Sequence, residues 1–254
     1  MSAPTSGSRP EMTALRIRFD DGRERDFRHR GTRADLGVIG QIFEAQEYSL
    51  RALQRGAELQ KLYKRIAGAG RAPLILDAGA NIGASVVYFA HAFSRAHILA
   101  IEPARNNFEL LQANAAGLDV DARCAAIGAA DGETALVDPG EGEWGYRTAP
   151  GAGGERVSVL SASRLAGEEQ AAGRVPFIAK IDIEGGEAEL FSRDTGWVDL
   201  FPVLIIELHD WLLPRAGSSR SFLRCIAERD RDFVFLGENV FSIANHWTAG
   251  PFHV

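Results

Sequence analysis

The chain has few cysteines and no long apolar run, and each absence narrows what the protein can be. Cys124 and Cys225 are the only cysteines among 254 residues, too few for a disulfide framework, so we expect a reducing, cytoplasmic compartment. No apolar run reaches the roughly 18 residues of a membrane span, so no membrane partner is expected. No Cys/His cluster has the spacing of a zinc site. The net charge of −6 gives no reason to expect nucleic acid as a partner.

The N-terminal part of the chain is predicted to differ from the rest. Residues 1–10 lack the continuous apolar stretch of a signal peptide, so we expect a disordered tail there. Within residues 11–70, alternating segments on either side of Asp20-Asp21-Gly22 predict a hairpin. One helix with a cap at Thr32 to Asp35 should run to Phe43, and another from Leu50 to Ile66. Together these pieces are expected to form a small cap beside a ligand site.

Residues 71–254 alternate between apolar runs and helical patterns, which predicts an α/β domain with a mostly parallel sheet. The stretch 138–155 is rich in glycine and acidic residues, holds Trp144 and Tyr146, and is predicted to be a long loop. Strands are expected near residues 74–77, 97–102, 120–126, 177–182, 202–208, 233–236 and 240–243.

The segment D-x-G-x-N-x-G is the most informative motif. An apolar strand ends in Asp77, and Gly79, Asn81 and Gly83 then frame a turn into a helix. A strand that enters a helix through such a turn presents backbone N–H groups to a cofactor. A dinucleotide site needs a third glycine, which is missing here, and the acid ahead of the first glycine favours a positively charged ligand. S-adenosylmethionine, which carries a sulfonium, therefore fits better than NAD.

A second acid follows the next predicted strand. Residues 97–101 form an apolar run that ends in Glu102-Pro103. Parallel neighbouring strands would bring Asp77 and Glu102 to the same edge of the sheet, and an acid at the second strand end commonly accepts hydrogen bonds from ribose hydroxyls. The two acids together indicate a cofactor that contains a nucleoside.

Two further strands also end in ionisable residues. The segment K-I-D-x-E-G-x-E places Asp182 and Glu184 after one strand, and I-E-L-H places Glu207 and His209 at the end of the next. A spacing of two puts each pair on one side of its strand. All four groups are therefore expected to converge at the carboxyl edge of the sheet.

In this order, the motifs resemble the FkbM family of S-adenosylmethionine-dependent methyltransferases over about residues 35 to 210. The resemblance implies a Rossmann-like class I methyltransferase fold, a seven-stranded mostly parallel sheet with an antiparallel last strand. It implies O-methylation of a hydroxyl on a small molecule such as a sugar or polyketide. By the same resemblance, Tyr48 should lie near the cofactor and Ala126 beside its adenine.

The catalytic chemistry leaves alternatives open. Asp182 or His209 takes the proton from the acceptor hydroxyl, or Asp182, Glu207 and His209 hold a divalent cation such as Mg²⁺ or Mn²⁺ that lowers the pKa of this hydroxyl. An unperturbed His209 would titrate near roughly 6.5. A third alternative is a structural cluster in which Lys180 and Glu187 pair with these groups.

Two other functional classes stay open beside the methyltransferase. The chain can be a non-catalytic or regulatory domain that binds a nucleoside cofactor, although the intact acidic motifs argue against it. An NAD-type oxidoreductase is disfavoured by the missing third glycine and by Asp77. The sequence identifies neither the methyl acceptor nor an oligomeric state, and a homo-oligomer is not excluded.

Overall fold

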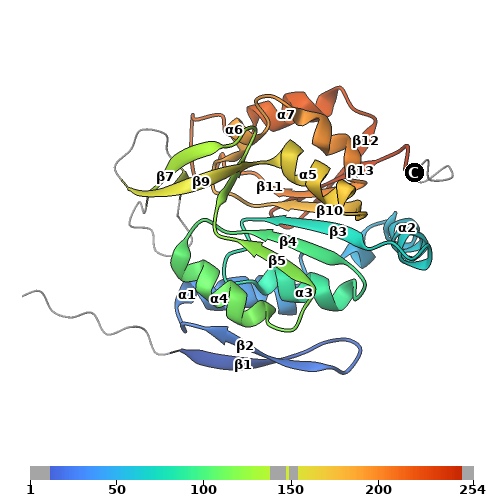
Figure 1. The fold of residues 1–254 in the computed structure, drawn as a ribbon, viewed down its shortest axis with the longest axis vertical. Coiled ribbons are helices and arrows are strands. Elements are labelled where there is room, and N and C mark those ends of the chain that lie inside the picture. Colours follow the sequence, from blue (N-terminus) through green and yellow to red (C-terminus); the bar gives the residue numbers. More distant parts are fainter. Residues whose placement is uncertain (1–11, 138–146, 149–153, 248–254) are drawn as a thin grey trace, which may run out of the picture.

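A computed structural model describes residues 12–137, 147–148 and 154–247. Its centre is a seven-stranded sheet (Figure 1). β13 runs antiparallel to both of its neighbours and all other neighbouring pairs are parallel, which confirms the predicted architecture. In spatial order the strands are β12 (Arg231–Leu236), β13 (Asn239–Ala244), β11 (Val203–Glu207), β10 (Val175–Ile181), β3 (Pro73–Ala78), β4 (His97–Ile101) and β5 (Val120–Arg123).

Helices cover both faces of this sheet (Figure 1). One face carries α1 (Arg33–Ile39), α2 (Gly56–Gly68), α3 (Ala84–Ala92) and α4 (Arg105–Ala115), and the other carries α5 (Ala162–Ala171), α6 (Glu187–Leu190), the 3₁₀ helix η3 (Thr195–Leu200) and α7 (Arg220–Ala227). None of the helices in the described ranges is long and apolar enough to cross a bilayer.

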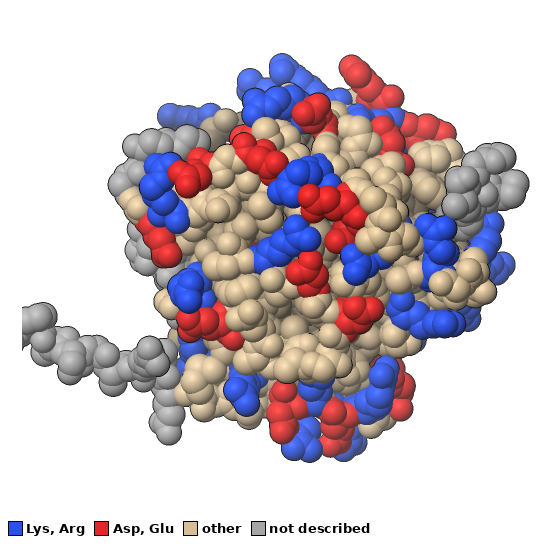
Figure 2. Space-filling model, in the orientation of Figure 1, with Lys and Arg blue, Asp and Glu red and all other residues tan. Residues whose placement is uncertain are grey.

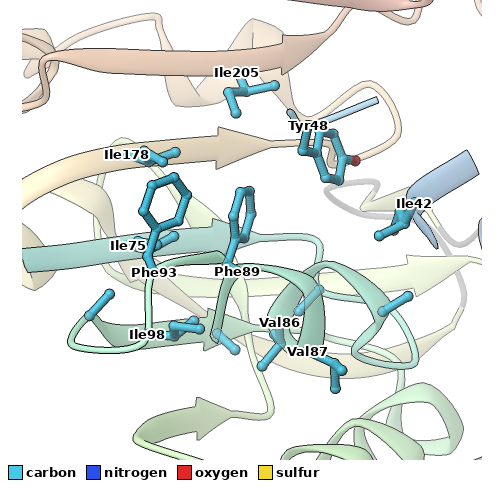
Figure 3. Packing of buried hydrophobic residues seen from close by; sticks show 14 of the residues in the cluster. Ile42, Tyr48, Ile75, Val86, Val87, Phe89, Phe93, Ile98, Ile178 and Ile205 are labelled. Atoms are coloured by element: carbon cyan, nitrogen blue, oxygen red, sulfur yellow. The ribbon is translucent and has the colours of Figure 1, made fainter. Parts of the chain in front are cut away.

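The apolar strands supply two cores because successive side chains point to opposite faces. Ile75 packs in the core beneath α3, whereas Leu74 and Leu76 belong to the core on the opposite face. Figure 3 shows Phe89 of α3, and Phe93 directly after that helix, between Ile178 and Ile98 of the first core. This two-sided burial explains why the central strands are almost uninterrupted apolar runs.

The N-terminal hairpin forms as predicted, from β1 (Thr13–Arg18) and β2 (Glu24–His29). It docks on the C-terminal end of α4, where the Arg25 guanidinium donates to the Asn114 carbonyl at 2.7 Å and the Arg28 N–H donates to the Asn114 side chain at 2.7 Å. Its outer face carries mixed charges, with Arg16 paired to Asp26. Figure 2 likewise shows blue and red atoms interspersed over this part of the surface rather than a single basic patch.

The predicted N-terminal helices are present in modified form. Thr32 caps α1 by accepting from the Asp35 N–H, and the chain continues as the π-helix η1 (Gly40–Glu44). The expected helix from Leu50 is broken: a 3₁₀ turn η2 (Leu50–Ala52) precedes α2, which starts only at Gly56. At Gly56 a Cβ would lie 2.1 Å from the Leu50 carbonyl oxygen, so the two segments meet closely at this break.

A second, four-stranded sheet was not predicted. It has the order β6 (Ala126–Gly128), β9 (Glu155–Ser161), β7 (Gly132–Val137) and β8 (Arg147–Thr148). The expected strand 120–126 divides between the two sheets because the Ala125 N–H turns back to the Arg123 carbonyl. Of the predicted loop 138–155, Glu155 begins β9, while Trp144 and Tyr146 lie outside the described residues, as do the predicted tail 1–10 and residues 248–254.

Candidate functional site

The turn after β3 touches the turn after β10. Gly79 has a φ of +77°, and a Cβ at this position would lie 1.7 Å from the Asp182 carbonyl oxygen, so only glycine fits. The Gly79 and Ala80 N–H groups both donate to the Ile101 carbonyl of β4, at 2.9 and 3.0 Å. The D-x-G-x-N-x-G turn is therefore fixed against two neighbouring strands at the carboxyl edge of the sheet.

Glu102 forms one wall of a hollow beside this turn. Its side chain accepts from the Asn81 and Ala104 N–H groups, each at 2.9 Å, and burial raises its pKa to about 7. The hollow is also lined by Gly79, Pro103, Ala126 and Asp182. Most residues predicted to contact the cofactor thus surround one space, and Glu184 borders it as well.

Asn107 is a lining residue that sequence reasoning missed. It lies in α4, its side chain is buried, and its Oδ1 has no hydrogen-bond partner within the described ranges. Its Nδ2 lies 3.5 Å from Glu102. Its position in the sequence could have identified it. Asn107 lies in the first turn of the helix that follows Glu102-Pro103, and this turn starts at the carboxyl edge of the sheet.

Two residues predicted to contact the cofactor, Asp77 and Gly83, do not line this hollow. Asp77 is fully buried and lies opposite Lys180 on β10, with 3.1 Å between its Oδ1 and the Lys180 Nζ. Gly83, at a φ of +89°, begins α3 and packs against Leu111. The cross-strand register directs the Asp77 carboxylate to a lysine, so its charge is already compensated inside the protein.

Lys180 ties the strand ends together. Its ammonium donates to the Gly79 carbonyl at 2.6 Å and lies 3.6 Å from Asp182. Burial alone would lower the pKa of Lys180, but the charges of its neighbours, with Asp77 first and Asp182 among the others, together outweigh burial and keep this pKa above its ordinary value. Lys180 therefore stays charged in the interior.

The predicted cluster of acids and histidine forms. The parallel register pairs Ile181 with Ile206, so the residues that follow on β10 and β11 come together. The Nε2 atom of His209 lies 3.5 Å from Asp182, 3.6 Å from Glu207 and 3.7 Å from Glu184. On the other side of the ring, Nδ1 is 2.9 Å from the buried carboxylate of Glu187. Lys180 and Glu187 thus do pair with the cluster, as the structural alternative requires.

The cluster alters the ionisation of two of its members. Burial alone would lower the pKa of His209, but the hydrogen bond with Glu187 and the charge of Asp182 raise it to about 9. The value near 6.5 of an unperturbed imidazole therefore does not apply to His209, whose raised pKa keeps the ring protonated at neutral pH. Burial and the charge of Asp182 raise the pKa of Glu207 to about 8.

Tyr48 lines a second hollow, which Asp182 also lines. Its ring stacks on Phe89 with 5.6 Å between centroids, and the Lys180 ammonium is 6.0 Å from the ring centre. Figure 3 shows the hydroxyl pointing away from the core, on the side of Ile42. The same hollow is lined by Glu47, Glu207, Lys180 and Ser85. Gly79, Asn81 and Asp182 line both hollows, so the two spaces meet at these residues.

Comparison with known proteins gives the family. The model of the methyltransferase FkbM domain matches residues 77–235. The chain belongs to the FkbM methyltransferase family. Membership of this family implies S-adenosylmethionine as the cofactor of a methyl transfer, and the matched region holds every acidic residue of the site described above except Glu47. No curated protein matches the chain.

Several solved structures are similar to this FkbM domain. The bifunctional kinase-methyltransferase WbdD is 12% identical with a TM-score of 0.44, over 77% of this chain and only 39% of WbdD. The O-methyltransferase from Bacillus cereus in complex with SAH is 12% identical with a TM-score of 0.43, over 82% of this chain and 91% of that one. A methyltransferase from Geobacter sulfurreducens is 16% identical with a TM-score of 0.38, over 82% and 87%.

The residues of the first hollow fit S-adenosylmethionine. The two backbone donors leave acceptor capacity on the Glu102 carboxylate for ribose hydroxyls. Asn107 adds a buried polar atom that has no partner among the described residues. Because Gly79 has no side chain, its backbone can pack against the Asp182 carbonyl and still line the hollow.

Proposed function

We propose that this FkbM domain methylates a hydroxyl group of a small molecule such as a sugar or polyketide. The observation that carries the proposal is the meeting of two hollows at Gly79, Asn81 and Asp182. One hollow would hold the adenosine part of the cofactor against Glu102, Pro103 and Ala126. The other would hold the acceptor against Tyr48 and Glu207, with the transferred methyl group between them.

S-adenosylmethionine supplies a methyl group on a sulfonium, which leaves a neutral thioether when a nucleophile attacks in line. The protein then has to align the acceptor and receive its proton. Asp182 and Glu207 are the carboxylates that line the acceptor hollow beside its junction with the first, and each offers an oxygen that can accept this proton. Asp182 also offers a negative charge that suits the positive sulfonium. Glu207 offers a charge, and can accept a proton, only once it has lost its own proton, above a pH of about 8. His209 faces these carboxylates from behind and would orient them rather than act as the base.

The cofactor half of the proposal has a direct test. S-adenosylhomocysteine at about 100 times its dissociation constant should stabilise the protein by about 2.7 kcal/mol. This corresponds to a melting shift of roughly 5–10 °C for a chain of this size. NAD should give no shift. A shift with NAD and none with S-adenosylhomocysteine would favour the oxidoreductase alternative.

The catalytic half needs acceptors. We would measure release of S-adenosylhomocysteine with panels of sugars and polyketide alcohols, comparing wild type with Glu207→Gln. The variant should lose about 10²–10⁴ in rate if Glu207 takes the proton. Glu238→Gln is the matched control, because Glu238 is an exposed acid near Glu207 that lines neither hollow. Turnover confined to amines or thiols would reject O-methylation. Cofactor binding without turnover of any nucleophile would favour the regulatory alternative.

A further inference from the structure

The His209 ring is held in one orientation by a carboxylate that faces no substrate space. Glu187 is fully buried, and its Oε1 lies 2.9 Å from the His209 Nδ1. Its other oxygen has no hydrogen-bond partner in the described part of the chain. With Nδ1–H donated to Glu187, Nε2 has to point the opposite way. A histidine that binds a metal almost always donates its other ring N–H to a carboxylate, a backbone carbonyl or a water molecule, and Glu187 is a partner of the first kind.

The opposite nitrogen is aimed at a set of carboxylates without forming a hydrogen bond. His209 is only 1% exposed. Its Nε2 lies 3.5 Å from Asp182 and 3.6 Å from Glu207, distances of ion pairs that are too long for good hydrogen bonds. One ligand atom from each of the three residues lies within 4.8 Å of the others. Ligands about 2.1 Å from a metal are about 3.4 Å apart in a tetrahedral site and about 3.0 Å apart at adjacent octahedral positions, so two of the three separations need to change by about 0.6 Å at most for the residues to share a cation.

From this geometry we infer that Asp182, Glu207 and His209 form a binding site for one divalent first-row metal ion, with Glu187 as the residue that positions His209. The ion would replace the proton on the His209 Nε2 and the proton of Glu207, and both protons would pass to solvent. The inference deepens the proposed function and rests on it, because Asp182 and Glu207 also line the acceptor hollow. Two carboxylates and one imidazole form a mixed ligand set that suits Mn²⁺ or Fe²⁺ better than Mg²⁺, which prefers oxygen ligands only.

The place of the site gives the cation a role. An ion bound there would border the acceptor hollow at the end of β11, within reach of a hydroxyl in that space. It would orient this hydroxyl and lower its pKa, so that the oxygen attacks as a stronger nucleophile. The cation would also balance the charge of the acids gathered at this edge, for which His209 and Lys180 are the nearby cations among the described residues.

Mn²⁺ binding tests the inference without an acceptor. The full chain would be treated with EDTA, dialysed, and titrated with Mn²⁺ while free Mn²⁺ is followed by electron paramagnetic resonance. Wild type should bind one Mn²⁺ per chain. Glu207→Gln and His209→Ala should weaken binding at least as much as Glu187→Gln, for which a loss of about 10–100-fold is expected. Glu238→Gln, which removes a nearby exposed acid outside the ligand set, should bind as wild type does.

Each outcome supports or overturns the inference. No stoichiometric Mn²⁺ in wild type, or binding that survives both Glu207→Gln and His209→Ala, would overturn the metal site and leave an ion-pair cluster. Wild-type binding in Glu187→Gln would overturn the positioning role of Glu187. Circular dichroism identifies a variant that has failed to fold, and if His209→Ala fails in this way, Glu207→Gln at the half-buried Glu207 decides the test alone. Binding of S-adenosylhomocysteine is measured on the same samples, so failure of the cofactor assignment is seen separately from failure of the metal site.

Discussion

Replacing Lys180 with methionine should destabilise the protein strongly, because it would leave Asp77 as a buried and unpaired charge. Lys180 is 2% exposed and Asp77 is 0% exposed, with 3.1 Å between the charged atoms. Neither Asp77 oxygen has another hydrogen-bond partner within the described ranges. Removal of one partner of a buried ion pair typically costs about 3–5 kcal/mol. At about 2–4 °C per kcal/mol, the melting temperature should fall by roughly 6–20 °C.

The double variant Lys180→Met with Asp77→Asn separates this cause from simple loss of packing. It removes both charges, so much of the lost stability should return, and the two substitutions should couple favourably in a double-mutant cycle. Urea unfolding followed by far-UV circular dichroism gives the free energies. Lys61→Met, on the exposed side of α2, is the matched control and should change stability by less than about 0.5 kcal/mol. The reasoning fails if Lys180→Met costs under about 1 kcal/mol or if the double variant is no more stable than Lys180→Met.

Three more predictions concern the cofactor hollow. Glu102→Ala should weaken S-adenosylhomocysteine binding by about 1.5–3 kcal/mol, or roughly 10–150-fold in calorimetry, and an unchanged affinity would reject the ribose contact. Burial raises the pKa of Glu102 from 4.5 to about 7, so the affinity of the wild type for S-adenosylhomocysteine should fall as the pH drops through about 7 and Glu102 becomes protonated. The folding stability of the ligand-free protein should change in the opposite direction. The stability that Glu102 contributes is present below about pH 4.5 and is lost as the pH rises through about 7. Gly79→Ala should abolish cofactor binding, since its Cβ would meet the Asp182 carbonyl, whereas Gly196→Ala has open space and should be tolerated; equal affinity in both would contradict the close approach.

The central strands of the main sheet were predictable because they are buried on both faces and most of them end in or are followed by an acid. A short apolar run between a turn and an acid is best explained as a buried strand. All seven strands of the main sheet lie within a few residues of the expected positions. The second sheet was missed for the opposite reason. In β9, Val157 is buried while Arg156 and Ser158 are exposed, so the strand has only a weak alternation beside a glycine-rich stretch.

The site was predictable at the level of strand ends but not of partners. Parallel register alone brings Asp182, Glu207 and His209 together. The pairing of Asp77 with Lys180 depends on which residues of β3 and β10 stand opposite each other, and a β-bulge between Pro176 and Ile178 shifts that register. The raised pKa of His209 depends on Glu187, which reaches the ring from the start of α6. The sequence therefore allows Lys180 and Glu187 to be named as partners of the cluster, but the spacing of residues along one chain does not show which acid Lys180 faces or which ring atom Glu187 meets.

Because Lys180 is buried, the rate at which its amine is chemically labelled reports how often this part of the protein opens. The chain holds three lysines, and Lys61 and Lys64 are exposed on α2, whereas Lys180 is enclosed and charged. An amine reacts with acylating or reductively alkylating reagents only when it is exposed and has lost its proton. In the native protein the two helix lysines should therefore be labelled rapidly, and Lys180 only during excursions in which the ends of β3 and β10 separate. Mass spectrometry would compare the labelling rate of Lys180 with those of Lys61 and Lys64 in the same molecule. The ratio measures how often the carboxyl ends of β3 and β10 open.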